Sequence, residues 1–480
     1  MKITLPKIII FLILVNFLLR IPFLNLPAHF DEINYFNALL AIYNNHFNPF
    51  VVFYSYKPPV DFIIPAIFFK LFGPARIWGR LATAAYSSLV LLFNYLLAKR
   101  VFNHRVAIFS TVLLFCFPMF MVQSFLFQGM VSLTALTLAS VYFYFSRQKK
   151  LYFLTASLLV LDKETAIFIL IFLAAYDFLI NIRKRRFTDL IKQTIFLISP
   201  IGWLVIWMLI NKFLFSWFLW PTHLAFYETN NFMKLILSYS LDYILIENPL
   251  IKISGMLIGL CIIITVLSKK YRQRLWKKEN SLFLSLFFFY SLFYTYGYFI
   301  PRYLLFVYPL YFMVFSQLII KLFPKKTYIL VLLMVFAGGL LLSNYFSIFR
   351  VKQFHWVGDV DFGLFGKINL QQKTLNYLNN NFQESIVLSN WLIAELWRQP
   401  FFGYTKKEGI AFDFSQKDNR EIITNIINYQ DKKPILLVIA SDYDRPVNYL
   451  LSFDWELIQT IKLDNLKESQ EKFLIFRLKQ

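Results

Sequence analysis

The residues of this sequence that are best suited to proton transfer or metal binding are a pair of adjacent carboxylates. Asp31 and Glu32 occur in the stretch "HFDEINYF", which follows the first long apolar run of the chain. A carboxylate can accept a proton from a reacting hydroxyl group or bind a hard metal ion. Asp31 can also cap a helix that begins near Ile33, with Glu32 complementing the helix dipole. The two interpretations are compatible, because a carboxylate held at a helix start is well oriented for either chemistry.

Five basic residues accompany these carboxylates in separate short segments between apolar runs. They are Lys57, Arg76, Arg80, Lys163 and Arg302. Each alone is typical of an interfacial anchor, and Lys163 next to Glu164 can form a simple ion pair. Together they form a group of cations suited to a phosphate or diphosphate carried on a lipid, because Arg offers paired donors and Lys a point charge.

Two of these sites have local sequence features that define their position. Lys57 precedes Pro58 and Pro59, which keep the chain extended and hold the ammonium group at a defined place. Arg76 and Arg80 are four residues apart, so they share one face of a helix. That spacing suits lipid headgroups or a bound phosphate.

The composition indicates a polytopic membrane protein. Hydrophobic residues make up 58% of the 480 residues and aromatic residues 20%, and several runs exceed the about 18 to 20 apolar residues that a bilayer span needs. The net charge is +22, but the basic residues lie in short clusters between apolar runs, which argues against nucleic-acid binding. Cys116 and Cys261 lie inside apolar segments, so neither a disulfide nor a zinc site is predicted.

We predict about eleven membrane-spanning helices. The intervals are 7–25, 77–98, 106–122, 126–145, 151–162, 165–181, 194–212, 250–268, 281–299, 303–322 and 327–345. The loops rich in Lys and Arg all fall on one side of this arrangement, which the positive-inside rule assigns to the cytoplasm. The first helix is expected to be retained. The N-terminus is therefore expected on the cytoplasmic side of the plasma membrane, and the region after residue 345 on the outer side.

Two domains are expected. Residues 1–348 form the membrane domain, whose outer loop 26–76 carries the two carboxylates and an amphipathic surface helix, "VDFIIPAIFFKLFG". Residues 349–480 form a small extracytoplasmic α/β domain. Its strands are predicted at 385–390, 434–441 and 472–478 and its helices at 373–382 and 419–429. It has no Gly-rich phosphate loop and no metal-spaced Cys or His, so we assign it no chemistry.

Five motifs in order resemble the GT-C glycosyltransferases, in the branch of the protein O-mannosyltransferases and the lipid A aminoarabinose transferases. They are "FDEINYFNALL", "YKPPVDFIIPAIFFKLFG", "GRLATAAYSSL", "LVLDKETAIFI" and "PRYLLFVYPLY", within residues 8–345. The resemblance implies a glycosyltransferase that moves a hexose or pentose, with inversion, from a polyprenyl-phosphate donor. The acceptor would be a lipid, glycan or protein outside the membrane, and the other partners would be membrane lipids.

The resemblance also suggests roles for individual residues. Asp31 would be the catalytic base or a metal ligand, with Glu32 beside it, and Lys57, Lys163 and Arg302 would face the donor phosphate. Arg76 and Arg80 are added to these phosphate-binding candidates because of their spacing on one helix face. Many family members carry a second Asp at the outer start of the fourth span, where this chain has Gln128 and Gly129. A divalent metal ion at Asp31 is the one cofactor considered, and a single carboxylate pair offers it few oxygen ligands.

Two alternatives remain open. A flippase for lipid-linked sugars also needs a cationic cavity, but it predicts charges in the middle of spans and related halves, and neither is evident in this sequence. A non-catalytic membrane scaffold that presents residues 349–480 is the second alternative, and the missing acid near Gln128 favours it.

Overall fold

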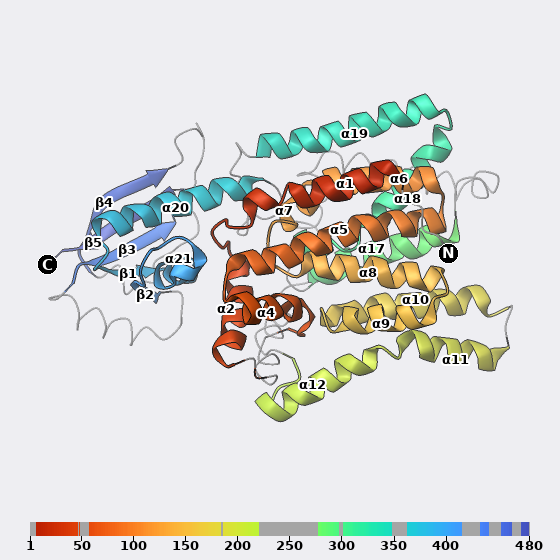
Figure 1. The fold of residues 1–480 in the computed structure, drawn as a ribbon, viewed down its shortest axis with the longest axis horizontal. Helices are drawn as coiled ribbons and strands as arrows, with labels where there is room; N and C mark the ends of the chain where they lie inside the picture. Colours follow the sequence, from red (N-terminus) through yellow and green to blue (C-terminus); the bar gives the residue numbers. More distant parts are fainter. Residues whose placement is uncertain are drawn as a thin grey trace. The chain divides into compact units, whose positions relative to one another are not determined.

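The computed structural model describes residues 6–46, 48, 57–183, 186–219, 277–296, 301–347, 362–414, 433–440, 453–462 and 472–479. The chain groups into two compact units. The first unit comprises Met1–Pro22, Ala38–Pro74 and Trp78–Leu342, and the second comprises Phe23–Asn37, Ala75–Ile77 and Ser343–Gln480. The first unit is helical, and the second contains the β-sheet (Figure 1).

The first unit is built from helices, many of which run side by side in Figure 1. α8 packs against α9, α6 against α18, and α10 against α11. Each predicted span contains one or more helices, except 250–268, which lies outside the described residues. The helices, including those that continue into the second unit, are α1 (Lys7–Leu18), η1 (Ile21–Phe23), α2 (Asp31–Asn44), α4 (Val60–Phe72), α5 (Arg76–Val101), α6 (His104–Cys116), α7 (Pro118–Gln123), α8 (Met130–Phe145), α9 (Lys149–Val160), η2 (Glu164–Ala166), α10 (Ile167–Asn181), α11 (Phe187–Ile198), α12 (Ile201–Phe215), α17 (Lys278–Tyr296), η5 (Pro301–Leu304), α18 (Tyr308–Leu322) and α19 (Lys326–Ser347).

Some of these helices meet the length and hydropathy expected of a membrane span. Among the described residues, α5 and the continuous stretch Glu164–Asn181 are long and apolar enough by themselves. α11 and α12 together pass the same test, although they meet at a bend of 46°. The total of about eleven spans therefore stays a prediction.

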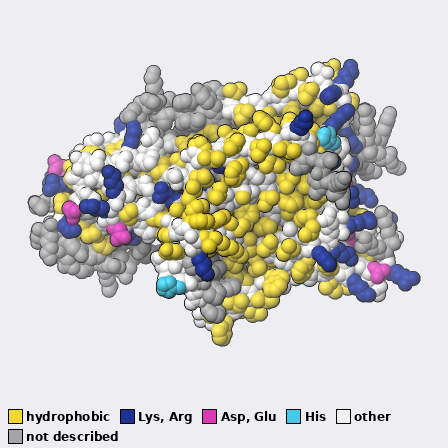
Figure 2. Space-filling view, in the orientation of Figure 1, with side chains coloured by type: hydrophobic (Ala, Val, Ile, Leu, Met, Phe, Trp, Pro, Cys, Tyr) yellow, Lys and Arg dark blue, Asp and Glu magenta, His cyan; other side chains and the backbone are white. Residues whose placement is uncertain are grey.

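Three of the segments rich in Lys and Arg lie close together. The side chain of Arg100 at the end of α5 donates to the carbonyl of Phe145 at the end of α8, at 3.2 Å. Lys277, just before α17, donates to the Val101 carbonyl at 2.9 Å. Figure 2 shows Lys and Arg gathered at this end of the helical unit, with apolar side chains covering the surface between its ends. This separation of charge from apolar surface is what a membrane protein requires.

Buried polar side chains pair with one another between the apolar helices. The Asn16 amide of α1 donates to the Ser87 hydroxyl of α5 at 2.7 Å, and the Asn280 amide of α17 donates to Gln317 of α18 at 3.0 Å. Leucine-rich surfaces gain little by leaving lipid for one another, so such hydrogen bonds help to define which helices pair.

The second unit contains a five-stranded sheet with strand order β2-β1-β3-β5-β4. The strands are β1 (Ile386–Ser389), β2 (Ile410–Asp413), β3 (Ile435–Ala440), β4 (Trp455–Lys462) and β5 (Lys472–Leu478). β1 pairs in parallel with β2 and β3, while β5 is antiparallel to both β3 and β4. The helical elements α20 (Gly363–Asn381), α21 (Trp391–Arg398) and η6 (Pro400–Phe402) accompany the sheet.

The structure confirms the three predicted strands as β1, β3 and β5, and the helix predicted at 373–382 as the end of α20. The helix predicted at 419–429 lies outside the described residues. β2, β4 and α21 were not predicted. Both missed strands are sheet edges, and β4 is largely solvent-exposed, so neither shows the apolar run of a buried strand.

The second unit also contains the segment that carries the two carboxylates. The Ala28 N–H donates to the carbonyl of Phe402 at 2.9 Å, and the Phe30 ring meets the Trp391 ring edge-on at 6.0 Å between centroids. Residues 23–37 therefore pack with the C-terminal α/β elements, although more than 300 residues separate them in sequence.

Candidate functional site

The first carboxylate motif forms the start of α2. Asp31 is the first residue of this helix, so it does not cap a helix beginning at Ile33. Instead, Glu32 is fully buried and its Oε2 accepts a hydrogen bond from the His29 N–H at 3.0 Å. This return of a glutamate to the backbone before the helix resembles one half of a capping box. Glu32 thus stabilises the helix start, and it holds the neighbouring Asp31 in the first helical turn.

Arg76 interacts with backbone carbonyls inside the second unit. Its guanidinium donates to the carbonyls of Leu26, at 3.2 Å, and of Phe401, and it lies 3.4 Å from the carbonyl of Asn25. Gly403 has a φ of +87°, and a Cβ added there would lie 2.6 Å from Arg76 Nη2. These contacts tie the loop before α2 to η6, which favours a structural role for Arg76 over phosphate binding.

Arg76→Met is therefore expected to destabilise the second unit by about 1.5–3 kcal/mol, the range for hydrogen bonds to a charged group. Hydrogen exchange should accelerate at the amides of residues 23–30 and 401–403, and Lys406→Met, which removes an exposed charge in the same unit, should leave that exchange unchanged. A raised KM for a polyprenyl-phosphate donor with unchanged exchange would instead identify Arg76 as a phosphate ligand.

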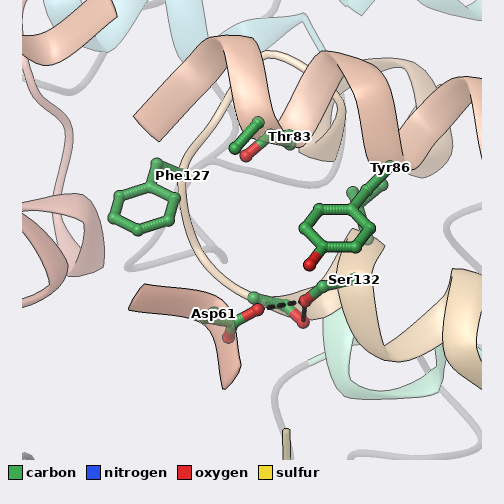
Figure 3. A pocket seen from close by; sticks show the side chains of 8 residues that line it. Asp61, Thr83, Tyr86, Phe127 and Ser132 are labelled. Atoms are coloured by element: carbon green, nitrogen blue, oxygen red, sulfur yellow. Dashed lines mark hydrogen bonds between the residues drawn. The ribbon is translucent and has the colours of Figure 1, made fainter. Parts of the chain in front are cut away.

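The largest group of buried charges lies in the first unit, around the start of α4. Lys57, which is 7% exposed, forms an ion pair with Asp61, which is 3% exposed. The Ser132 hydroxyl, in the first turn of α8, donates to the other Asp61 oxygen. Figure 3 shows Asp61 and Ser132 at one side of a pocket, with the Tyr86 hydroxyl of α5 pointing toward them. The sequence analysis included Lys57 but missed these three partners.

The break between α9 and η2 brings a second carboxylate to this group. The Val60 N–H at the start of α4 donates to the Leu161 carbonyl at 3.1 Å, so the residues that follow each of them, Asp61 and Asp162, are neighbours. Asp162 is 1% exposed. Burial raises the pKa of Asp162 well above its usual range, and the charge of Asp61 raises it further while Lys57 opposes the shift.

Lys163 and Arg302 lie close to each other beside an aromatic group. The Lys163 ammonium lies 4.0 Å from the centre of the Tyr303 ring, and the Arg302 guanidinium lies 5.4 Å from the same ring. Tyr294 is the other ring near Lys163, at 5.7 Å. Such rings stabilise a cation without neutralising it. Burial lowers the pKa of Lys163 to about 8; the charge of Glu164 opposes this shift, and the charges of Lys57 and Arg302 add to it.

The structure therefore brings three of the predicted basic residues, Lys57, Lys163 and Arg302, into one electrostatic neighbourhood of the first unit. Arg80 is buried on α5 in the same unit, at 1% exposure. Asp31, Glu32 and Arg76 belong to the second unit.

Asp61 and Asp162 are the two acidic site residues that the sequence analysis missed. Both stand at helix boundaries between apolar runs, and Asp61 follows Lys57 by four residues. A charge in such a place is a candidate functional residue by default, and the stretches "VDFIIPAIFFKLFG" and "LVLDKETAIFI" already contained this signal.

The position where family members carry a second acid is occupied differently here. Gly129 adopts a left-handed φ of +73° directly before α8, and Gln128 is 2% exposed. Among the residues that the structure describes, neither polar atom of the Gln128 amide has a hydrogen-bond partner. Because Ser132, one turn into α8, contacts Asp61, α4 supplies a carboxylate close to the helix start where the family pattern expects one.

The residues present do not fit a divalent metal ion. Hard cations take six or more oxygen ligands, usually including several carboxylates. Within the described part of the chain, no group of three or more His, Cys, Asp or Glu side chains could hold such an ion. The ionic partner of Asp61 is an ammonium group, and Glu32 bonds a backbone N–H. We therefore derive no step through a metal.

Comparisons with known proteins give the chain a family match and a fold. Residues 56–210 match the dolichyl-phosphate-mannose-protein mannosyltransferase family. The chain resembles ArnT from Cupriavidus metallidurans in the apo state, with a TM-score of 0.58 and 12% identity over 98% of this chain and 97% of that one. It resembles ArnT bound to undecaprenyl phosphate with a TM-score of 0.54, at the same identity and coverage.

A third similar structure is the archaeal oligosaccharyltransferase AglB from Archaeoglobus fulgidus, in complex with an inhibitory peptide and a dolichol-phosphate. The TM-score is 0.50 and the identity 11%, over 90% of this chain and 69% of that one. Comparison with curated protein sequences gives no match. At such low identities, the structural matches establish the fold.

Proposed function

We propose that this chain transfers a sugar from a polyprenyl-phosphate donor. Its predicted resemblance to the GT-C glycosyltransferases is confirmed by its fold and by the family match over residues 56–210. It is an integral membrane protein. Transfer proceeds with inversion to a lipid, glycan or protein acceptor on the outer side of the membrane. The observation that carries the proposal is that Lys57 and Arg302 both interact electrostatically with Lys163. The fold resembles that of ArnT, which has been seen bound to undecaprenyl phosphate.

The basic neighbourhood has the charge that a lipid-linked phosphate needs. Lys57 is paired with Asp61, so Lys163 and Arg302 supply most of the positive charge available to a ligand. A guanidinium binds two phosphate oxygens in a defined orientation, while an ammonium acts as a point charge. Their positive charges stabilise the negative charge that grows on the phosphate as its bond to the sugar breaks.

Asp31 serves as the base in this proposal. Its position in the first turn of α2, held by the backbone hydrogen bond of Glu32, orients one carboxylate toward an acceptor hydroxyl group. Asp31 takes the hydroxyl proton as the acceptor oxygen bonds to the anomeric carbon and the bond from that carbon to the phosphate oxygen breaks. The electron pair of the broken bond leaves with the polyprenyl phosphate.

The donor affinity should depend on pH through Lys163. Because its pKa is lowered to about 8, Lys163 is charged below this pH and neutral above it. The KM for the donor is therefore expected to rise as the pH increases through about 8. Lys163→Arg should remove this rise, because a guanidinium stays protonated throughout that range. An unchanged pH profile in this variant would show that another group causes the dependence.

The decisive experiment uses the purified full chain in liposomes with a radiolabelled polyprenyl-phosphate sugar. Appearance of the label in an acceptor, or in free sugar when water is the acceptor, supports the proposal. Movement of the labelled lipid between leaflets without release of sugar would instead identify a flippase. Donor panels with hexose and pentose head groups then identify the sugar.

A further inference from the structure

Two buried carboxylates in the first unit share one counter-ion. Asp61 and Asp162 are adjacent through the hydrogen bond from Val60 N–H to the Leu161 carbonyl, and Lys57 is the ammonium group paired with Asp61. With both carboxylates ionised, the trio would carry an excess negative charge in a site that is almost fully buried. Burying an unpaired charge costs far more than binding a proton, so one of the two carboxyl groups is expected to be protonated.

The contacts indicate which of the two carboxyl groups holds the proton. Both oxygens of Asp61 already accept a hydrogen bond, one from the Lys57 ammonium and the other from the Ser132 hydroxyl. Asp162 lies beside Asp61 and Ser132, yet neither of its oxygens has a hydrogen bond of ordinary geometry to any residue that the structure describes. Burial and the charge of Asp61 also raise its pKa. Asp162 is thus the protonated member.

The charged and titratable groups around this pair come from several elements. Lys57 and Asp61 belong to the start of α4, and Tyr86 of α5 interacts electrostatically with Asp61, Asp162 and Lys57. Lys163 and Glu164 follow Asp162 in the chain, Asp162 and Lys163 act on each other, and Arg302 acts on Lys163 from η5. Lys57 is the cation that forms an ion pair with Asp61.

A pocket opens next to the pair. Its volume is about 10 Å³, and it is lined by Asp61, Ala82, Thr83, Tyr86, Phe127, Gly129, Val131 and Ser132. This is room for about one water-sized group. Figure 3 shows the Thr83 side chain and the Tyr86 hydroxyl facing the same space as Asp61 and Ser132. The pocket therefore suits one polar group at the end of a larger molecule.

The Ser132 hydroxyl marks a place for a further hydrogen bond. It lies within reach of Asp61 and also 2.8 Å from the Gly129 carbonyl, but a hydroxyl group donates only one hydrogen bond at a time. Four residues earlier in the chain, the buried amide of Gln128 has no hydrogen-bond partner among the described residues for either of its polar atoms. A buried polar group of this kind needs a physical explanation, and a bound polar group or water is one.

We propose that Asp61 and Asp162 share one proton and, with Ser132 and Tyr86, form a subsite for a hydroxyl group of the substrate. Asp61 accepts a hydrogen bond from that hydroxyl, and Tyr86 or Ser132 donates to its oxygen. The hydroxyl belongs either to the sugar of the donor or to the acceptor. This subsite rests on the proposed glycosyltransferase function, whereas the proton shared by the pair does not.

Infrared titration tests the shared proton without any transfer assay. The full chain in lipid nanodiscs should show the carbonyl stretch of a protonated carboxyl group at neutral pH, and this band should disappear as the pH rises through the raised pKa of Asp162. Asp162→Asn should remove the band. Asp177→Asn is the matched control, because Asp177 is also buried but bonds Tyr144 on α8. A band at neutral pH that is the same in wild type and Asp162→Asn overturns the proposal.

Isosteric variants test the hydroxyl subsite through transfer from the labelled donor. Asp61→Asn should lower kcat/KM by about 10- to 100-fold, the loss of one hydrogen bond to a charged group, whereas the control Asp177→Asn, which lies outside the subsite and contacts Tyr144, should leave transfer unchanged. Ser132→Ala, a gentler change, tests the same subsite if Asp61→Asn does not fold. Equal transfer by wild type, Ser132→Ala and Asp61→Asn overturns the subsite.

Two arms of the assay identify the source of the hydroxyl. If Asp61→Asn and Ser132→Ala slow both release of sugar to water and transfer to an acceptor, the subsite binds a hydroxyl of the donor sugar. If they slow only transfer to the acceptor, it binds the acceptor hydroxyl. Absence of all transfer by wild type, with the Asp162 band present, would reject the proposed function while leaving the shared proton established.

Discussion

Asp31→Asn is expected to lower the rate of sugar transfer by about 10²- to 10⁴-fold, the contribution of a positioned general base. The amide has the shape of the carboxylate but does not take up a proton. The KM for the donor should change little, because the proposed donor ligands Lys57, Lys163 and Arg302 are not altered. Single-turnover transfer in liposomes, with the labelled donor saturating, measures the chemical step directly.

Glu32→Gln is the matched control for this prediction. A glutamine keeps one side-chain oxygen that can accept the hydrogen bond from His29 N–H, so α2 should still begin at Asp31. We expect at most about a tenfold loss of transfer, since one charged hydrogen bond becomes a neutral one. If Glu32→Gln abolishes transfer and Asp31→Asn does not, Glu32 is the base.

Lys57→Met is expected to lower the free energy of unfolding by about 3–5 kcal/mol, the cost of removing one partner from a buried ion pair. The Lys57 and Asp61 side chains are 9% and 2% exposed, so water cannot replace the lost ammonium at Asp61. Unfolding in mixed micelles, followed by circular dichroism, measures the loss. Lys70→Met, which removes an exposed lysine from the last turn of the same helix, should change the free energy by less than about 0.5 kcal/mol.

The double variant Lys57→Met/Asp61→Asn separates the ion pair from any direct role of Lys57 in donor binding. Removing both charges relieves the uncompensated carboxylate, so more than half of the lost stability should return. A double variant no more stable than Lys57→Met would mean that the ion pair does not explain the loss. If Lys57 also binds the donor phosphate, the donor KM stays raised in the double variant although its stability returns.

The fold could be predicted to the extent that burial leaves a strong pattern in the sequence. Long apolar runs predicted helices in each interval within the described residues, and the runs at 386–389, 435–440 and 472–478 predicted the inner strands of the sheet. The edge strands β2 and β4 were missed because an edge strand is partly solvated and alternates with polar residues. The helix α21 was missed because it is short, and a short segment shows too few repeats of the helical hydrophobic period to be recognised.

The sequence identified several basic residues of the candidate site but not the residues that they contact. Lys57, Lys163 and Arg302 stood out because charges next to apolar runs are rare and costly, and the fold places them in one neighbourhood. The same reasoning would have singled out Asp61 and Asp162. What it could not indicate is that Arg76 bonds the backbone near Phe401, because that contact joins residues 325 positions apart.

The sequence by itself determined a helical membrane protein with a GT-C-like order of motifs, and it predicted basic loops on one side and a C-terminal α/β domain. These properties follow from local composition and spacing, because apolar runs partition into the bilayer and basic loops stay on its cytoplasmic side. Tertiary structure alone decided that Asp61 neutralises Lys57, that Asp162 lies beside Asp61, and that the segment with Asp31 and Glu32 packs with the C-terminal elements. Charge pairing in a buried site depends on distances between residues far apart in the chain, and only the packed fold sets those distances.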